Sequence, residues 1–280
     1  MSDPLLKATG LEVTYGGRRT LSGQHVDGVK VLHGVDIEIR RGETIGIVGE
    51  SGSGKTTLGR ALLRLVDVSA GEIRFDGSDI THLPDGKMRP LRRRMQMIFQ
   101  DPMASLNPRH TIRRILVEPL LLHALAGNAR EAERQVAAIL DRVTLPQVVL
   151  DRNPHELSGG QRQRIGIARA ALLQPDFVLA DEIVSGLDVS TQAQVLNLLK
   201  ALSTDLGLSM AFISHDLSVI RAICDRVYVM RRGHVVEEGS CERVFNAPAS
   251  SYTRTLLDAI PLPEVDPEWL WRTSEDEDAA

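Results

Sequence analysis

The chain has 280 residues, a formal net charge of −4, 42% hydrophobic residues and 25% charged residues. These values predict a globular protein with a substantial core, and they argue against nucleic acid as a main partner, because surfaces that bind nucleic acid are usually strongly basic. The most apolar stretch, residues 115–125, contains Glu118 and Pro119, so no segment is expected to cross a bilayer. Cys224 and Cys241 form neither a metal-ligand spacing nor a disulfide framework, which favours a reducing, cytoplasmic setting.

Apolar periodicity predicts a series of strands in the amino-terminal part of the chain. Residues 5–15 form a first strand that ends at Tyr15, and residues 16–30, with four glycines, form a long loop or an irregular hairpin. Residues 35–39 alternate as in a half-exposed strand, whereas residues 44–48 form a buried strand. Residues 72–77 indicate a further strand that ends in a tight turn.

The remainder of the chain alternates between strand and helix patterns after a helical insertion. Residues 95–99 form an apolar strand that ends at Gln100. From residue 111 to about 143 the pattern is helical and is divided by Pro119 and Gly127, which predicts a helical lobe inserted into an α/β core. The following elements are expected to be a helix at 158–173, a strand at 177–180, a helix at 190–206, a strand at 210–213, a short helix from 216, and a hairpin of strands at 226–230 and 234–237.

Residues Gly49–Thr56 read G-E-S-G-S-G-K-T, the G-x-x-x-x-G-K-[ST] pattern of a phosphate-binding loop. A buried strand precedes the loop and a helix follows it, so backbone N–H groups and the positive end of the helix dipole meet at a position that suits a polyphosphate. Lys55 adds charge for the β- and γ-phosphates, and the Thr56 hydroxyl can bind Mg²⁺. A purely structural glycine turn is the alternative, but the placing of the strand and the helix favours nucleotide binding.

The strand at 177–180 is followed by two acids, Asp181 and Glu182. A parallel strand delivers them to the sheet edge at which the phosphate loop also opens. Asp181 suits Mg²⁺ coordination, and Glu182 is placed to orient and polarise an attacking water molecule. Without the phosphate loop, a solvated acidic turn would be preferred; together with it, the pair indicates a Walker B motif.

Residues Leu157–Gln161 read L-S-G-G-Q and begin a helix. Ser158 and Gln161 have the spacing of a capping box, so an ordinary capped helix is one interpretation. Gly159 and Gly160 leave the backbone N–H groups of the first turn uncovered, which suits a second anion site. One phosphate loop together with a separate anion-binding helix start suggests two copies, each of which completes the nucleotide site of the other.

With these motifs in place, the chain resembles an ABC-type ATPase subunit over about residues 5–245. Its L-S-G-G-Q sequence matches the family signature without deviation. The resemblance implies that Tyr15 stacks on adenine, that Gln100 belongs to the Q-loop, that Ser185–Asp188 form the D-loop, and that His215 is the switch histidine. Taken singly, these would be ordinary residues at strand ends or in the core; their order relative to the motifs gives them these roles.

Additional segments are similar to the ATP-binding subunits of bacterial oligopeptide, dipeptide and nickel importers. They are residues 49–60, 99–108, Pro154–Leu157 and Tyr252–Leu257. In that group, two different ATPase subunits commonly pair beneath two permeases, which are supplied by an extracytoplasmic binding protein.

The sequence departs from the family pattern at two places. The family usually has Pro and then a small residue after the catalytic Glu, whereas this chain has Ile183 and Val184. Because Glu182 is retained, hydrolysis is expected, with an altered local turn. Some relatives carry a carboxyl-terminal cysteine cluster that holds iron–sulfur; no cysteine follows Cys241 in this sequence, so no cluster is expected.

The resemblance implies an α/β fold, in which a RecA-like P-loop NTPase core of the ABC ATPase type carries an antiparallel β subdomain and an inserted helical subdomain. The ABC ATPase domain is expected at residues 5–260, with the helical subdomain at about 101–170. Residues 261–280 are proline-rich and then acidic, and are expected to be a mobile, solvating tail.

The implied site uses ATP and Mg²⁺ and is completed by the signature residues of a second subunit. ATP lies on the phosphate loop, with Tyr15 against the adenine, while Glu182 and His215 orient the water. The expected catalytic residues are Glu182, His215, Gln100 and Lys55; the nucleotide-binding residues are Tyr15, Gly49, Glu50, Ser51, Gly52, Ser53, Gly54, Lys55, Thr56, Thr57, Ser158, Gly159, Gly160, Gln161 and Asp188; the Mg²⁺ ligands are Thr56, Gln100 and Asp181.

The implied function is that of the ATP-binding and ATP-hydrolysing subunit of a bacterial ABC importer for peptides or a related small solute. The expected partners are a second ABC ATPase subunit, in a homodimer or heterodimer, transmembrane permeases and, indirectly, an extracytoplasmic solute-binding protein; nucleic acid is not among them. The expected location is peripheral, on the cytoplasmic face of the inner membrane. One alternative is a soluble ABC-type ATPase in translation or DNA repair, although such a protein usually has both ATPase halves in one chain or a long coiled-coil insertion. A second alternative is a nucleotide-binding regulator without turnover, which the intact Glu182 disfavours.

Overall fold

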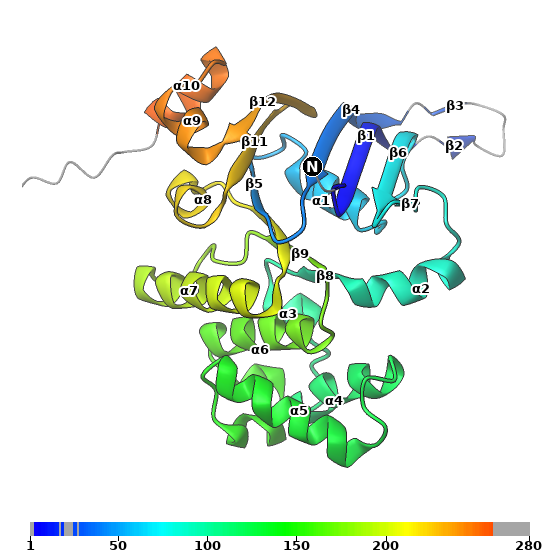
Figure 1. Cartoon of the computed structure of the whole chain (residues 1–280), viewed down its shortest axis with the longest axis vertical. Helices are drawn as coiled ribbons and strands as arrows, with labels where there is room; N and C mark the ends of the chain where they lie inside the picture. Colours follow the sequence, from blue (N-terminus) through cyan, green and yellow to red (C-terminus); the bar gives the residue numbers. More distant parts are fainter. Residues whose placement is uncertain (1–2, 17, 20–24, 27, 260–280) are drawn as a thin grey trace, which may run out of the picture.

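Two β-sheets form the upper part of the molecule, and a group of helices forms the lower part (Figure 1). The computed structural model describes residues 3–16, 18–19, 25–26 and 28–259. The tail expected at residues 261–280 lies outside the described residues.

The core sheet has six strands in the order β12-β11-β5-β10-β9-β8. Strands β8 to β11 run parallel to β5, and only β12 is antiparallel to its neighbour. All residues of β5, β9 and β10 are buried, as expected for parallel strands covered on both faces. The bounds are β5 Thr44–Val48, β8 Met95–Ile98, β9 Phe177–Asp181, β10 Ser209–Ile213, β11 Arg226–Arg231 and β12 His234–Ser240.

The second sheet is antiparallel and has the order β4-β1-β6-β7. Its strands alternate between buried and exposed residues, because one face packs on the core and the other faces solvent. The strand expected at residues 35–39 begins earlier, at Val29. The bounds are β1 Leu6–Tyr15, β4 Val29–Ile39, β6 Ala70–Phe75 and β7 Ser78–Asp79, and a separate pair of short strands comprises β2 Arg18–Arg19 and β3 His25–Val26.

Helix α1 (Lys55–Leu62) lies between the two sheets and is the next element after β5 (Figure 1). Leu58, Ala61 and Leu62 are fully buried in a cluster to which both sheets contribute. A Cβ atom at Gly59 would lie 2.7 Å from a methyl carbon of Leu179, so the small residue lets the helix approach β9 closely. The position of the phosphate loop is therefore fixed by the packing of both sheets.

The lower part of the molecule is helical (Figure 1). The interruption expected at Pro119 is wrong: Pro119 lies inside α4, which runs on to Leu122 although the proline lacks the N–H group that would bond to the preceding turn. The expected break at Gly127 falls between α4 and α5. The elements are α2 Asp85–Arg94, α3 Pro102–Ser105, α4 Ile112–Leu122, α5 Ala129–Arg142, the 3₁₀ turns η1 Gln147–Asp151 and η2 Pro154–Glu156, and α6 Gly159–Leu172.

The remaining helices flank the core sheet. They are α7 Val189–Leu206, α8 Leu217–Ile223, α9 Cys241–Asn246 and α10 Ser251–Asp258. Helices α9 and α10 lie beside β12 and were not expected from the sequence (Figure 1). In the described part of the chain, no helix is long and apolar enough to cross a membrane. The predicted α/β architecture, with a parallel core, an antiparallel β subdomain and a helical subdomain, is confirmed.

Candidate active site

The loop between β5 and α1 has a backbone that requires glycine. Gly49, Gly52 and Gly54 have φ values of 148°, 77° and 103°, which L side chains rarely adopt. A Cβ atom at Gly49 would lie 2.8 Å from Ser53 Oγ and 3.1 Å from the carbonyl carbon of Met230, and closer still to its oxygen. The loop is therefore pressed against the end of β11, and its curvature turns the following N–H groups toward one position.

Lys55 holds this loop from the inside. Its Nζ atom donates hydrogen bonds of 2.8 Å to the carbonyl oxygens of both Gly49 and Glu50. The side chain is buried, and burial lowers the pKa of Lys55, although the nearby carboxylates of Glu182, Asp181 and Glu50 act in the opposite direction. An ammonium group at a helix start suits a phosphate ligand.

Asp181, at the end of β9, faces the first turn of α1. Thr56 Oγ1 donates a hydrogen bond of 3.1 Å to Asp181 Oδ1. Asp181 is buried, and burial raises its pKa, with a further contribution from the charge of Glu182. A buried carboxylate and a hydroxyl that face each other supply the oxygen ligands that Mg²⁺ prefers, so the residues present fit this ion.

Glu182 lies beside both Gln100 and His215, which follow the ends of β8 and β10. Gln100 Nε2 donates a hydrogen bond of 3.0 Å to Glu182 Oε2, and His215 Nδ1 lies 3.7 Å from Glu182 Oε1. The backbone of Glu182 has a φ of 48° and is tied to β10 by a hydrogen bond of 2.9 Å from its N–H group to the carbonyl oxygen of Ile213. A non-glycine residue in this conformation is strained by about 1–3 kcal/mol, a feature common at functional sites.

Ile183 and Val184, which depart from the family pattern, are buried in the turn after Glu182. Ile183 and Val184 are 1% and 3% exposed and belong to the main core cluster. Ser185 closes the turn, because its Oγ atom donates a hydrogen bond of 2.8 Å to the carbonyl oxygen of Glu182. Gln100 Nε2 also lies within 3.4 Å of Ser185 Oγ. Ser185 was not among the expected site residues, although the D-loop pattern around it was visible in the sequence.

Other expected site residues lie on separate elements. Tyr15 ends β1 of the antiparallel sheet, and the residue is 42% exposed. Ser158 and Gly159 are exposed at the start of α6, in the helical part of the molecule (Figure 1). Asp188 is the N-cap residue that precedes α7 and accepts a hydrogen bond of 2.8 Å from the Thr191 N–H group.

The signature motif forms the expected capping box. The Ser158 N–H group donates to Gln161 Oε1 at 3.0 Å, and the Gln161 N–H group donates to Ser158 Oγ at 3.3 Å. A Cβ atom at Gly159 would have no neighbour within 4 Å, so this helix start is open. The capped helix is therefore present, and its role as an anion site stays a prediction.

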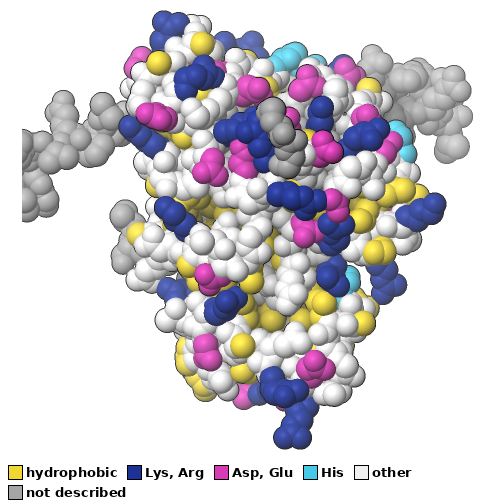
Figure 2. Space-filling model, in the orientation of Figure 1, with side chains coloured by type: hydrophobic (Ala, Val, Ile, Leu, Met, Phe, Trp, Pro, Cys, Tyr) yellow, Lys and Arg dark blue, Asp and Glu magenta, His cyan; other side chains and the backbone are white. Residues whose placement is uncertain are grey.

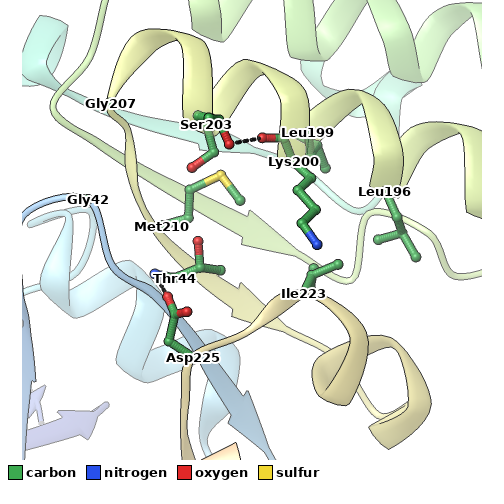
Figure 3. A pocket seen from close by; sticks show the side chains of 11 residues that line it. Gly42, Thr44, Leu196, Leu199, Lys200, Ser203, Gly207, Met210, Ile223 and Asp225 are labelled. Carbon is green, nitrogen blue, oxygen red and sulfur yellow. Dashed lines mark hydrogen bonds between the residues drawn. The ribbon is translucent and has the colours of Figure 1, made fainter.

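A cavity of about 340 Å³ lies at the opposite edge of the core sheet, between the starts of β5 and β10 and the side of α7 (Figure 3). Thr44, Met210 and Asp225 line it from the strand side. The phosphate loop is at the other ends of these strands, so this cavity is separate from the candidate active site.

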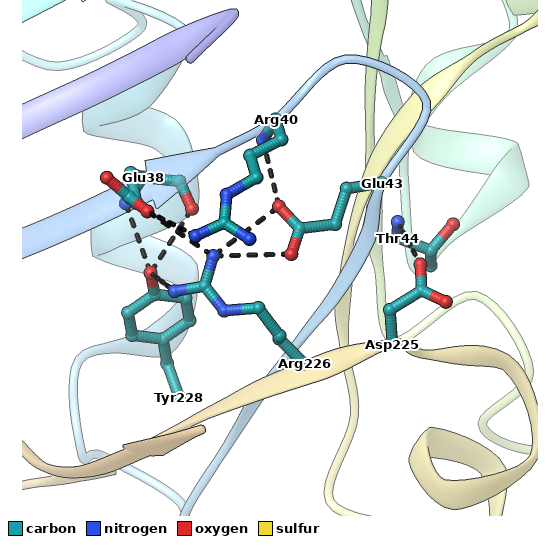
Figure 4. A network of polar contacts seen from close by, with 7 residues as sticks. All are labelled: Glu38, Arg40, Glu43, Thr44, Asp225, Arg226 and Tyr228. Atoms are coloured by element: carbon teal, nitrogen blue, oxygen red, sulfur yellow. Dashed lines mark hydrogen bonds and ion pairs between the residues drawn. The ribbon is translucent and has the colours of Figure 1, made fainter. Parts of the chain in front are cut away.

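A polar network joins the two sheets at that same opposite edge (Figure 4). Arg226 donates hydrogen bonds of 3.2 Å to Glu43 Oε1 and of 2.8 Å to the Tyr228 hydroxyl. The N–H group of Glu38, in β4, donates to the same hydroxyl at 3.2 Å. The network therefore stabilises the junction of the sheets at a distance from the candidate active site.

One residue that contacts the phosphate loop was missed as a site residue. The hydroxyl of Tyr252, in α10, accepts a hydrogen bond of 3.2 Å from the N–H group of Glu50. The only sequence signal was the segment Tyr252–Leu257, which resembles the peptide-importer group but carries no motif for phosphate binding.

The glycine loop, the paired acids and the capped glycine helix together define a P-loop nucleotide hydrolase with a separate signature helix. A family model described as ABC transporter matches residues 32–185, and the chain belongs to this family. Its ATPase activity and its predicted resemblance to the ABC family are thereby confirmed.

Known relatives are ATP-binding proteins of transporters. The chain is 52% identical over 263 residues to a putative peptide import ATP-binding protein of Brucella ovis, covering 94% of this chain and 80% of that protein. It is 49% identical over 236 residues to the oligopeptide transport ATP-binding protein OppF of Streptococcus mutans, covering 84% of this chain and 77% of the relative.

Solved structures show the same fold. The dimeric ATP-binding cassette MJ0796, bound to ADP and Pi in a post-hydrolysis state, has a TM-score of 0.75 and 28% identity and covers 84% of this chain and 98% of that one. The cbiO1 protein from Clostridium perfringens, part of the ABC transporter complex cbiONQ, has a TM-score of 0.72 and 28% identity and covers 87% of this chain and 91% of that one.

Proposed function

We propose that this chain couples its ATPase activity to the import of peptides. The observation that carries the proposal is the convergence of Lys55, Thr56, Asp181 and Glu182 at one edge of the core sheet. The peptide substrate class is supported by the names of the relatives from Brucella ovis and Streptococcus mutans.

ATP is bound by groups that the fold already holds in place. The N–H groups at the start of α1 and the ammonium of Lys55 contact the phosphates, and the exposed ring of Tyr15 stacks on the adenine. Thr56, Asp181 and Gln100 would hold Mg²⁺, which offsets negative charge on the phosphates when it is bound.

Hydrolysis transfers the γ-phosphoryl group to water. The carboxylate of Glu182 orients the water and accepts its proton, while the water oxygen forms a bond to the γ-phosphorus. The bond from that phosphorus to the bridging oxygen of ADP breaks, which yields ADP and inorganic phosphate. Gln100 is hydrogen-bonded to Glu182 and His215 lies beside it, so both residues are close to the reacting groups.

A second ATPase subunit completes the site. Ser158–Gln161 lie on a different part of the chain from the phosphate loop and present an open helix start to solvent. MJ0796 is dimeric, which supports a pairing of two subunits, and in such a pair each subunit would supply its signature helix to the partner. Closure of the pair would then assemble the catalytic site, and ATP would shift the population toward the closed state.

The permease is expected to dock between the core sheet and the helical subdomain. On the face shown in Figure 2, hydrophobic side chains gather around a hollow above the helices. A cavity of about 360 Å³ is lined by the segment that follows α1 and by α2, β8, α4 and α6, and it includes Phe99, which directly precedes Gln100. Leu65 and Leu122 line it although they are 46% and 60% exposed. Exposed apolar side chains beside the Q-loop suit a partner that senses the state of the nucleotide.

The charge of this cavity suggests the chemistry of the docked segment. Arg169 lines it and donates a hydrogen bond to the backbone oxygen of Ser105, and burial lowers the pKa of its guanidinium. Arg92 lines the same cavity. An apolar permease segment with one acidic residue would satisfy both features, and it would place this chain peripherally on the cytoplasmic face of the inner membrane.

The substitution Glu182→Gln tests the catalytic assignment. The amide keeps the shape of the side chain, so ATP binding is expected to persist while steady-state turnover falls by at least about 100-fold. Glu242→Gln, a surface change on α9, is the matched control and should leave turnover unaltered. Wild-type turnover in the Glu182 variant would refute the assignment of the base.

The importer is tested by uptake and by association. Cells that lack this chain should lose uptake of labelled peptide, and the wild-type chain should restore it. Leu122→Asp should leave the ATPase activity of the isolated protein intact but abolish its recovery with membranes. Full peptide uptake without the chain, or its recovery with ribosomes or DNA rather than with membranes, would contradict the proposal and favour a soluble role.

A further inference from the structure

Helix α10 is held firmly against the core sheet at its amino-terminal end. The carboxylate of Glu237, in β12, accepts hydrogen bonds of 2.8 Å from the Ala249 N–H group and of 3.0 Å from the Ser250 N–H group. Glu237 is 7% exposed, and these two N–H groups immediately precede the helix. A buried carboxylate at a helix start is favourable for both partners, because it satisfies unpaired N–H groups and meets the positive end of the dipole.

This attachment places Tyr252 behind the phosphate loop. The Tyr252 side chain is 7% exposed, and the guanidinium carbon of Arg231 lies 4.8 Å from its ring centroid. Its hydroxyl accepts the hydrogen bond of 3.2 Å from the N–H group of Glu50. Glu50, in the phosphate loop, is therefore hydrogen-bonded to Tyr252, which is 202 positions away in sequence.

The hydrogen bond involves the same peptide group that holds Lys55. The N–H group of Glu50 and the carbonyl group of Gly49 belong to one planar unit and point in opposite directions. Tyr252 binds the N–H side, and Lys55 Nζ binds the carbonyl oxygen at 2.8 Å. Rotation of this peptide would break both bonds, so the Tyr252 hydroxyl keeps the carbonyl directed at the ammonium group.

We propose that Tyr252 is a positioning residue for nucleotide binding. Its hydroxyl fixes the peptide between Gly49 and Glu50, this peptide fixes the Lys55 ammonium, and α10 thereby raises the affinity of the site for ATP. The inference rests on the proposed use of the phosphate loop for ATP, and it adds a role for the carboxyl-terminal helix that the catalytic motifs do not include.

The variant Tyr252→Phe tests the proposal in the full-length protein, because it removes the hydroxyl and keeps the buried ring. The expected result is a dissociation constant for Mg-ATP raised about three- to tenfold, the loss expected for one hydrogen bond. The KM for ATP should rise by a similar factor while kcat changes little, since Tyr252 does not touch the reacting groups. Hydrogen exchange of the Glu50 amide should also become faster.

Tyr228→Phe is the matched control. Its hydroxyl is also buried and also accepts a hydrogen bond of 3.2 Å from a backbone N–H group, but it lies in the network at the opposite edge of the sheet (Figure 4). This variant should lower the thermal midpoint and leave the dissociation constant for ATP within twofold of wild type. Glu237→Gln, which weakens the attachment of α10, should shift ATP affinity in the same direction as Tyr252→Phe.

The outcomes separate this inference from the proposed site. Equal ATP affinity and equal exchange of the Glu50 amide in Tyr252→Phe and wild type would overturn the role of Tyr252. Undiminished ATP binding in Lys55→Ala would instead overturn the phosphate loop as the nucleotide site. A Tyr252 variant that loses only thermal stability, as the Tyr228 control does, would show that the contact merely supports the fold.

Discussion

Gly49→Ala is expected to be far more damaging than the size of a methyl group suggests. The φ of 148° at Gly49 is poorly accessible to alanine, which costs about 1–3 kcal/mol. The added carbon would also meet Ser53 Oγ at 2.8 Å and press on the Met230 carbonyl group, and such overpacking costs about 1–3 kcal/mol more. The sum, about 2–6 kcal/mol, is a large part of the stability of a typical domain, about 5–15 kcal/mol.

Gly52→Ala separates the two contributions. Gly52 also has a positive φ, 77°, but a Cβ atom there would meet nothing within 4 Å. Only the backbone cost, about 1–2 kcal/mol, should then apply. Unfolding in urea at 25 °C, followed by circular dichroism, measures both variants against wild type. Equal urea midpoints for the two variants would refute the close packing of the loop on β11 as the source of the larger effect.

Three further outcomes are expected. Asp181→Asn should fold normally yet lose the Mg²⁺ dependence of ATP binding, measured by titration with and without the ion, because an amide oxygen is a weaker ligand than a carboxylate; retained Mg²⁺ dependence would exclude Asp181 as a ligand. Burial alone would raise the pKa of Glu237, but hydrogen bonds from the Ala249 and Ser250 N–H groups and the charge of Arg243 lower it overall. The stability that Glu237 contributes is therefore complete above its ordinary pKa of about 4.3 and is lost as the pH falls through the lowered value, so urea midpoints of wild type and Glu237→Gln should differ at pH 7 and converge toward pH 3. Leu58→Ala, in the helix between the sheets, should cost about 2–5 kcal/mol, and a thermal midpoint near wild type would contradict its full burial.

Much of this molecule could be predicted because its motifs are local. The glycine loop, the two acids at the end of β9 and the signature helix each depend on neighbours within a few residues, and all three occupy the expected kind of element. The order of motifs in the family then predicted Gln100 and His215 as site residues. In the structure, Gln100 donates a hydrogen bond to Glu182 and His215 lies beside it, which agrees with that prediction.

Other features depended on packing that no local pattern records. Helix α2 contains Pro90 and several arginines, which weaken its apolar periodicity. Helix α4 continues through Pro119, although a proline inside a helical pattern usually marks the end of the helix. The contact between Tyr252 and Glu50 joins distant parts of the chain through α10, whose position depends on a carboxylate of an edge strand. Such contacts follow from the tertiary fold and not from the spacing of residues.

The hydrogen bonds of Lys55 have a thermodynamic consequence for its ligand. An ammonium group has three N–H donors, and two of them bind carbonyl oxygens of the loop itself. The Lys55 side chain thus holds the loop in its shape, and one N–H donor remains to face a phosphate. Most of the conformational entropy of the loop is therefore lost when the protein folds and not when the nucleotide binds. The loop is preorganised for its ligand. A substitution such as Lys55→Met would remove the hydrogen bonds to the loop together with the positive charge. Its effect on ATP affinity would therefore measure the sum of these two contributions.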